Sequence, residues 1–282
     1  MVETFSCGSK TFLIGEYSVI FGGSAVLLVT DPQFNLEVAV SDTTRLVGVN
    51  ENSPAFKFYQ RYREVFGGLS ITFANSLLHY GGFGTSSAQF SLLYKLFLQK
   101  TNKSFDIGLF LKEYRQLSCE NHETPQMQPS GADCLAQYYN HHIYFDSVSN
   151  YLEPIECNFP DLGIEIFKTG FKIFTHKHLQ SLRNADIPES AKCQLRQMVS
   201  DAWDYLKKNN GESLARCVND FFLFLNEIGF VDGRSLNLVK KIMRVEGVIA
   251  AKGCGAMCLD TILVIYRKTH HECLEVIRNC LL

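Results

Sequence analysis

A run of glycine and hydroxyl residues in the first third of the sequence has the chemistry of an anion site. It reads Gly-Gly-Phe-Gly-Thr-Ser-Ser-Ala over residues 81–88, and the apolar spacing of residues 88–99 predicts a helix directly after it. Glycines let the backbone turn without Cβ clashes. Free N–H groups at a helix start attract phosphate, and serine hydroxyls can bind Mg²⁺. Alone, the segment fits a capped helix after a flexible loop equally well, and it lacks the Gly-Lys-Ser/Thr ending of a Walker A loop.

A lysine enters a predicted strand near the start of the sequence. Residues 8–23 read Gly-Ser-Lys-Thr-Phe-Leu-Ile-Gly-Glu-Tyr-Ser-Val-Ile-Phe-Gly-Gly, and the strand is expected over 11–14. The ammonium of Lys10 could stabilise a developing alkoxide or a phosphate oxygen. A surface lysine on an edge strand fits the same pattern, so this segment alone leaves both interpretations open.

An aspartate follows a turn sequence in the middle of the chain. Residues 128–133 read Gln-Pro-Ser-Gly-Ala-Asp. An aspartate displayed on a tight turn could accept the proton of an attacking hydroxyl or orient that hydroxyl. Upstream, Glu120 or Glu123 could help hold Mg²⁺. These residue types are also common in structural turns, so a purely structural turn stays open.

A fourth segment, residues 252–260, reads Lys-Gly-Cys-Gly-Ala-Met-Cys-Leu-Asp and lies between predicted strands at 247–251 and 261–266. It could reach the first half of the chain and complete a phosphate site. A glycine-containing hairpin is the structural alternative.

Strands and helices alternate through both halves of the sequence, which predicts an α+β protein. We expect two domains, residues 1–152 and 153–282. The main predicted elements are strands at 25–30, 35–41 and 70–74, helices at 56–66, 88–99 and 106–120, a helical stretch at 189–229 interrupted at 209–211, and helices at 234–245 and 270–282.

Composition narrows the function classes. The 282 residues carry 27 Lys+Arg against 29 Asp+Glu, a net charge of −2, which disfavours a nucleic-acid partner. No apolar run approaches 18 residues, so we expect no membrane span. The 10 cysteines show no CxxC pair and no zinc-type spacing, which favours reduced cysteines in the cytoplasm.

Taken together, the four segments resemble the GHMP kinases, named for galactokinase, homoserine kinase, mevalonate kinase and phosphomevalonate kinase. That family shows a Gly-Lys-x-x-Leu-x-Gly-Glu-His/Tyr strand, a Gly-Leu-Gly-Ser-Ser-Ala phosphate loop, a Ser-Gly-x-Asp turn and a Lys-x-x-Gly-Ala-Gly-Gly-Gly loop. Here all four occur in this order, from Gly8 to Asp260. The resemblance implies two α+β lobes with the active site between them, and it implies ATP and Mg²⁺ as cofactors.

The resemblance also implies roles, position by position. Lys10 would lie near the accepting hydroxyl, and Asp133 would be the base or would orient that hydroxyl. One departure is the last loop, which has Met, Cys and Leu at residues 257–259 where the family usually has glycines. The residues that would contact the ATP phosphates are Gly82, Phe83, Gly84, Thr85, Ser86, Ser87, Ala88, Gly253, Gly255 and Ala256.

The implied metal ligands are Ser86 or Ser87 together with Glu120 or Glu123. Mevalonate kinases carry their metal-binding glutamate eleven residues before the turn aspartate, and here that position is His122. The two neighbouring glutamates are therefore both retained as predictions.

The acceptor is expected to be a small molecule of the mevalonate pathway, in isoprenoid biosynthesis. Residues 15–22 have the gapless spacing of mevalonate kinases, and residues 129–133 have their form of the turn. Tyr17 in place of histidine, and Asp260 directly after the last loop, resemble phosphomevalonate kinases. Mevalonate is placed ahead of phosphomevalonate. The remaining alternatives for the function are a related ATP-using decarboxylase and a ligand-binding homologue without catalysis. A homodimer is possible, and the sequence does not decide the oligomeric state.

Overall fold

The chain folds into two compact units. The computed structural model describes residues 2–73, 82–119, 128–171, 187–255 and 258–281. One unit comprises residues 1–11 and 27–143, and the other comprises 12–26 and 144–282. The chain passes between them within strands β1 (Val2–Ile14), β2 (Ser24–Val40) and β5 (Ile143–Asp146). The α+β class is confirmed, while the division into domains 1–152 and 153–282 stays a prediction.

The larger sheet has the strand order β3-β4-β2-β5-β6, and β1 pairs with β2 outside that path. Strand β4 (Leu69–Phe73) runs antiparallel to β2, with Leu36 opposite Phe73, and parallel to β3 (Arg45–Val47). The last strand of this path is β6 (Tyr151–Pro154). The two strands predicted at 25–30 and 35–41 are one continuous strand, β2.

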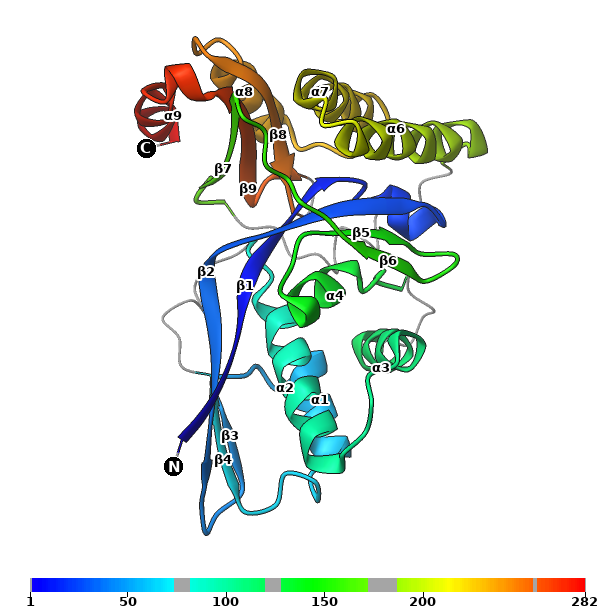
Figure 1. Cartoon of the computed structure of the whole chain (residues 1–282), viewed down its shortest axis with the longest axis vertical. Coiled ribbons are helices and arrows are strands. Elements are labelled where there is room, and N and C mark those ends of the chain that lie inside the picture. Colours follow the sequence, from blue (N-terminus) through cyan, green and yellow to red (C-terminus); the bar gives the residue numbers. More distant parts are fainter. Residues whose placement is uncertain (1, 74–81, 120–127, 172–186, 256–257, 282) are drawn as a thin grey trace. The chain divides into compact units, whose positions relative to one another are not determined.

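Among the described residues, four α-helices belong to the first unit: α1 (Pro54–Arg61), α2 (Thr85–Thr101), α3 (Ile107–Cys119) and α4 (Ala132–Tyr139). Helix α1 packs on α2 and α3, and α2 packs on α4 (Figure 1). The Ser53 hydroxyl caps α1 by accepting from the Phe56 N–H at 3.2 Å, with Pro54 at the first helical position. Helix α4 was absent from the sequence prediction, and its position decides the geometry of the site.

Aromatic rings fill the interior between α1 and α2. Phe58 is fully buried, and its ring centroid lies 5.3 to 5.5 Å from those of Phe90, Tyr94 and Phe97. Edge-on and tilted pairs at this spacing add attraction to the area that they bury. The first unit therefore has its own core, on which the ends of α2 and α4 can be held in place.

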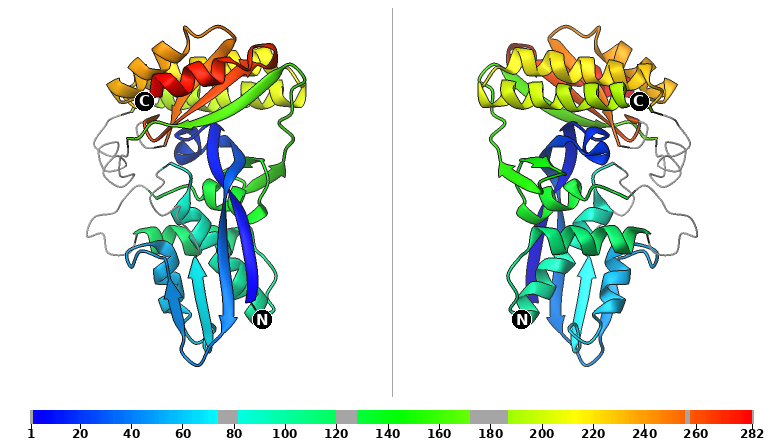
Figure 2. Two further views of the ribbon diagram at one scale, coloured as in Figure 1. Left: turned by 90° about the vertical axis from the view of Figure 1, so that its left-hand side faces the viewer. Right: turned by 90° about the vertical axis from the view of Figure 1, so that its right-hand side faces the viewer.

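The second unit contains a three-stranded antiparallel sheet of order β7-β9-β8, formed by Leu162–Lys168, Thr261–Arg267 and Val248–Cys254. Helices α6 (Glu189–Lys207) and α7 (Gly211–Glu227) lie side by side, and α7 packs on β8 (Figure 2). The predicted interruption at 209–211 is confirmed, because the Asn210 side chain caps α7 there. The remaining elements are α8 (Gly233–Ile242), α9 (Cys273–Leu281), η1 (Ser18–Phe21) and η4 (Lys268–His270). In the described part of the chain, no helix combines the length and apolar character needed to cross a membrane.

Phe58→Ala tests the aromatic core. We expect the free energy of unfolding in urea to fall by about 3–5 kcal/mol, since the substitution leaves a cavity among packed rings. Leu109→Ala is the control, because Leu109 is 62% exposed, and its effect should stay within about 0.5 kcal/mol. Equal losses in the two variants would contradict this account of the core.

Candidate functional site

The loop before α2 is shaped by two glycines in the left-handed region. Gly82 has φ 85° and Gly84 has φ 84°, and Gly84 is the N-cap residue of α2. A Cβ on Gly84 would lie 2.9 Å from both Cγ and Cε of Lys10, so a larger residue cannot occupy this position without displacing the lysine. Since glycine has no side chain, Gly84 itself does not cap the helix, and a helix start is a position that suits an anion.

Lys10 lies on β1 beside this loop. Its backbone N–H donates to the carbonyl of Phe83 at 3.1 Å, which ties the strand to the loop. Its Nζ lies 3.8 Å from Oδ2 of Asp133, and the two side chains are 15% and 22% exposed. The structure therefore brings together the two predicted catalytic residues and the predicted phosphate loop within one unit.

Asp133 lies in the first turn of α4. The sequence had indicated that it lies on the turn before this helix. Gly131, with φ 80°, is the N-cap residue and redirects the chain into the helix. A carboxylate in the first turn is stabilised by the helix dipole. The packing against α3 requires glycine at this position, because a Cβ on Gly131 would lie 2.5 Å from Cδ2 of Leu111.

Helix α3 also holds the backbone just before α4. Arg115 donates from Nε and Nη2 to the carbonyl of Ser130, at 3.2 and 2.7 Å. Burial lowers the pKa of Arg115, and burial raises the pKa of Tyr114 well above its ordinary value. The contact of Arg115 with the Ser130 carbonyl was not predicted from the sequence, because no local pattern links α3 to the turn.

The two serines of the loop have different environments. Ser87 is 2% exposed, and its single hydroxyl proton is shared between the Gly84 carbonyl at 2.9 Å and Oε1 of Gln137 at 2.6 Å. Ser86 is exposed. Of the two predicted Mg²⁺ ligands, Ser86 has the accessible hydroxyl, whereas the proton of Ser87 is engaged inside the protein. Binding of Mg²⁺ by either serine stays a prediction.

The fourth segment lies in the second unit and folds back on itself. Gly253 is the penultimate residue of β8, and a Cβ there would collide with the Cys258 carbonyl and the Ser235 hydroxyl, which are themselves hydrogen-bonded. Gly255 has φ 85°, and Asp260 donates its N–H to the Cys254 carbonyl at 3.0 Å. These glycines permit close approach within the loop. Their predicted contact with ATP phosphates stays a prediction.

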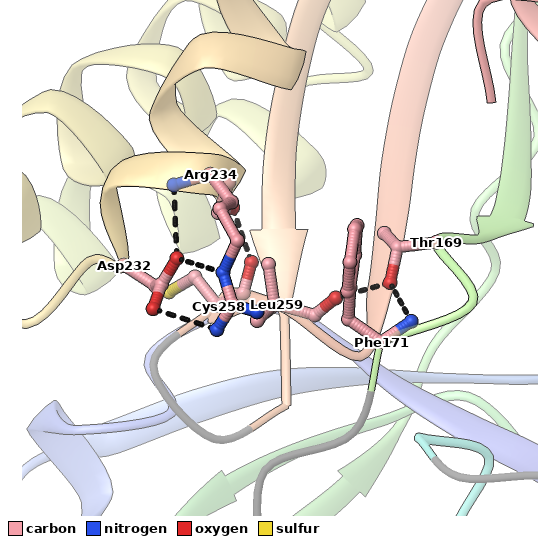
Figure 3. Close-up of polar contacts among 7 residues, drawn as sticks. Thr169, Phe171, Asp232, Arg234, Cys258 and Leu259 are labelled. Carbon is pink, nitrogen blue, oxygen red and sulfur yellow. Dashed lines mark hydrogen bonds and ion pairs between the residues drawn. The ribbon is translucent and has the colours of Figure 1, made fainter.

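Side chains from outside the loop hold it in place, as Figure 3 shows. The Thr169 hydroxyl donates to the carbonyls of Leu259 and Asp260. Asp232 caps α8 by accepting from the Arg234 N–H at 2.8 Å, and the Arg234 guanidinium pairs with the same carboxylate. The Ser235 hydroxyl of α8 donates to the Cys258 carbonyl, so residues 258–260 are held by Thr169, directly after β7, and by α8.

Within the second unit, a buried ion pair connects β8 to the segment that follows β1. Nζ of Lys252 donates to Oε1 of Glu16 at 2.6 Å, and the side chains are 0% and 9% exposed. Burial alone would lower the pKa of Lys252, yet the Glu16 carboxylate holds that pKa above its ordinary value. Nζ also donates to the Phe12 carbonyl at 3.3 Å. Glu16 of the Gly-Glu-Tyr sequence thus has a structural partner that sequence analysis did not identify.

Some predicted residues lie outside the described ranges, namely Gly81, Ala256, Glu120 and Glu123. Within the described part of the chain, no three His, Cys, Asp or Glu side chains gather into a metal-binding group. The glutamate contribution to a metal site stays a prediction.

Several solved kinase structures share this fold. Streptococcus pneumoniae phosphomevalonate kinase, in complex with phosphomevalonate and AMPPNP, aligns with a TM-score of 0.78 at 15% identity, covering 99% of this chain and 96% of that one. Methanococcus jannaschii mevalonate kinase aligns with a TM-score of 0.73 at 15% identity, covering 99% and 95%. Lactococcus lactis galactokinase, complexed with galactose, has a TM-score of 0.73 at 12% identity, covering 99% and 88%.

These three proteins are GHMP kinases, so the chain has the GHMP kinase fold, as its motifs indicated. No protein-family profile matches the chain, and no curated protein matches it in sequence. The fold is thus shared at low sequence identity, and the activity is a matter for proposal.

Lys252→Met tests the buried ion pair. We expect the free energy of unfolding in urea to fall by about 3–5 kcal/mol, because the Glu16 carboxylate would be left buried without its cation. Adding Glu16→Gln should recover part of the loss. The control is Lys207→Met, which removes an ion pair to Asp204 whose side chains are each 51% exposed, with an expected cost of about 0–1 kcal/mol. Similar costs at the two lysines would refute a special role for burial.

Proposed function

We propose that this chain is an ATP-dependent small-molecule kinase of the GHMP family, acting on a mevalonate-pathway substrate, with mevalonate as the first acceptor. One observation carries the proposal. Within a single unit, the Lys10 ammonium lies 3.8 Å from the Asp133 carboxylate, and Gly84 at the start of α2 lies against the lysine stem. A cation, a proton acceptor and an anion-binding helix start are the parts that phosphoryl transfer to a hydroxyl needs.

The residues present suit ATP by their chemistry. A glycine at the N-cap leaves the first turn of α2 without a side-chain cap from that residue, and the Lys10 stem lies against the Gly84 backbone, which puts a cation beside the helix start. The phosphates would bind at residues 82–88, and the accessible hydroxyl of Ser86 is the better placed of the two serines for Mg²⁺. When bound, ATP supplies the phosphoryl group and Mg²⁺ neutralises its charge.

Asp133 and Lys10 act on the acceptor in this proposal. The carboxylate of Asp133 accepts a hydrogen bond from the substrate hydroxyl, which orients it, and then takes its proton as the oxygen attacks. The Lys10 ammonium stabilises the negative charge that develops on that oxygen. Both side chains are partly exposed, so each can contact a ligand and its own partner. A cytoplasmic location belongs to the same proposal.

A coupled assay of ADP release tests the activity. The purified chain with ATP and Mg²⁺ is offered mevalonate, phosphomevalonate, homoserine and galactose in parallel. We expect acceptor-dependent ADP formation with mevalonate. A response to phosphomevalonate instead would reassign the acceptor, and release of CO₂ would identify the related decarboxylase. ATP binding without acceptor-dependent ADP would support a non-catalytic homologue and would overturn the kinase proposal.

Asp133→Asn tests the role of the carboxylate. Asparagine keeps the shape but cannot take the proton, so kcat should fall about 10²- to 10⁴-fold. Binding of ATP, measured by calorimetry, should be unchanged because the loop before α2 is intact. Asp106→Asn is the matched control, since Asp106 accepts from the Leu109 N–H at 2.7 Å near the start of α3 and asparagine caps a helix equally well. Near-normal turnover of the Asp133 variant would sink the assignment.

A further inference from the structure

A buried glutamine on α4 contacts two of the motif segments at once. Gln137 has no exposed surface. Its Oε1 accepts from the Ser87 hydroxyl at 2.6 Å, and its Nε2 donates to the Gly8 carbonyl at 3.0 Å. A buried carboxamide costs free energy unless both of its ends are hydrogen-bonded, and here both are.

Each partner of Gln137 leads directly to the site. Ser87 also donates to the carbonyl of Gly84, the residue that lies against the Lys10 stem. Gly8 lies two residues before Lys10 on the same strand. Through these two contacts, one side chain limits the movement of both the phosphate loop and the strand that carries the lysine.

Side chains of α4 and of its C-cap residue bond both the carbonyl and the N–H of Gly8. While Gln137 bonds the Gly8 carbonyl, the Gly8 N–H donates to Oδ1 of Asn140 at 2.7 Å. Asn140 ends α4 in the left-handed conformation, with φ 54°. Two side chains of one helix thus determine where this part of β1 lies.

The same helix carries Asp133, one turn before Gln137. Residues four apart lie on one face of a helix, so the carboxylate and the carboxamide face the same side. The position of Lys10 relative to Asp133 is therefore set through α4, and Gln137 connects the helix to both other segments.

We propose that Gln137 is a positioning residue for phosphoryl transfer. It acts through Ser87 on the phosphate loop and through Gly8 on Lys10, and its burial keeps it away from substrate. This inference rests on the proposed kinase function. Misplacing a reacting group by about 1 Å can cost on the order of 100-fold in rate, so the effect of losing Gln137 should appear in kcat.

Gln137→Met is the first test, with Gln89→Met as the matched control. Gln89 is also buried, at 5% exposed, but its Nε2 donates to the Gly48 carbonyl at 2.8 Å, away from the motif segments. Methionine keeps the approximate volume and removes the hydrogen bonds. We expect kcat to fall about 10- to 100-fold in the Gln137 variant and less than twofold in the control, at similar melting temperatures. Equal losses of kcat in the two variants would overturn the proposal.

Gln137→Glu is the second test and serves where the methionine variant does not fold. A protonated carboxyl group can donate to Gly8 and accept from Ser87, whereas an ionised one cannot donate. Burial raises the pKa of a carboxyl group, so activity relative to wild type should rise as the pH is lowered from 9 to 6. A constant ratio across this range would contradict the proposal.

Amide hydrogen exchange separates this inference from the proposed function. If the wild-type chain forms no ADP with any acceptor, the kinase proposal fails. The exchange rates at residues 8–11 and 84–88 then still test whether Gln137 holds the two segments together. Faster exchange there in Gln137→Met than in Gln89→Met would support this role. Equal exchange in the two variants would refute it.

Discussion

The close approach of Gly84 to Lys10 is the constraint on which the geometry of the first unit depends. A Cβ at Gly84 would lie 2.9 Å from two carbons of the lysine stem. Because that Cβ is missing, the Phe83 carbonyl can reach the Lys10 N–H at 3.1 Å, and α2 begins beside the lysine. Asp133 on α4 completes the group at 3.8 Å from Nζ. The helix start and the cation are therefore joined through the backbone of Phe83 and Gly84, and the carboxylate is brought to them by α4.

Two lysine–carboxylate pairs differ in burial, and this difference decides whether each pair can meet a ligand or can only stabilise the fold. Lys10 and Asp133 are 3.8 Å apart and partly exposed, so solvent or a ligand can compete for either group. Lys252 and Glu16 are 2.6 Å apart and almost fully buried, so neither can leave without exposing an unpaired charge to an apolar interior. Both pairs come from motif segments of the sequence. Membership in a motif thus does not decide whether a charged residue meets a ligand.

The sequence predicts those elements whose pattern is long and periodic. Helix α2 follows from its apolar face, and the break between α6 and α7 follows from the Asn-Asn-Gly sequence at 209–211. Strand β2 was predicted as two strands, and it continues through Pro32 although proline is disfavoured within strands. Helix α4 was missed because it has only eight residues and begins within turn-forming residue types. Its N-cap, Gly131, packs against Leu111 of α3, a tertiary contact that the local sequence does not reveal.

Packing, and not position in a motif, decides which side chains can meet a ligand. Ser86 and Ser87 are equivalent in the motif, yet one is exposed and the other is bonded to Gln137. Gln137, which donates to the Gly8 carbonyl, lies 129 residues from Gly8 in the chain, so no local pattern could reveal this contact. Tyr17, which resembles phosphomevalonate kinases in sequence, is 3% exposed with its ring centroid 4.6 Å from that of Phe230. A side chain so enclosed reports on core packing, so the choice of acceptor has to rest on residues that stay exposed around the reacting group.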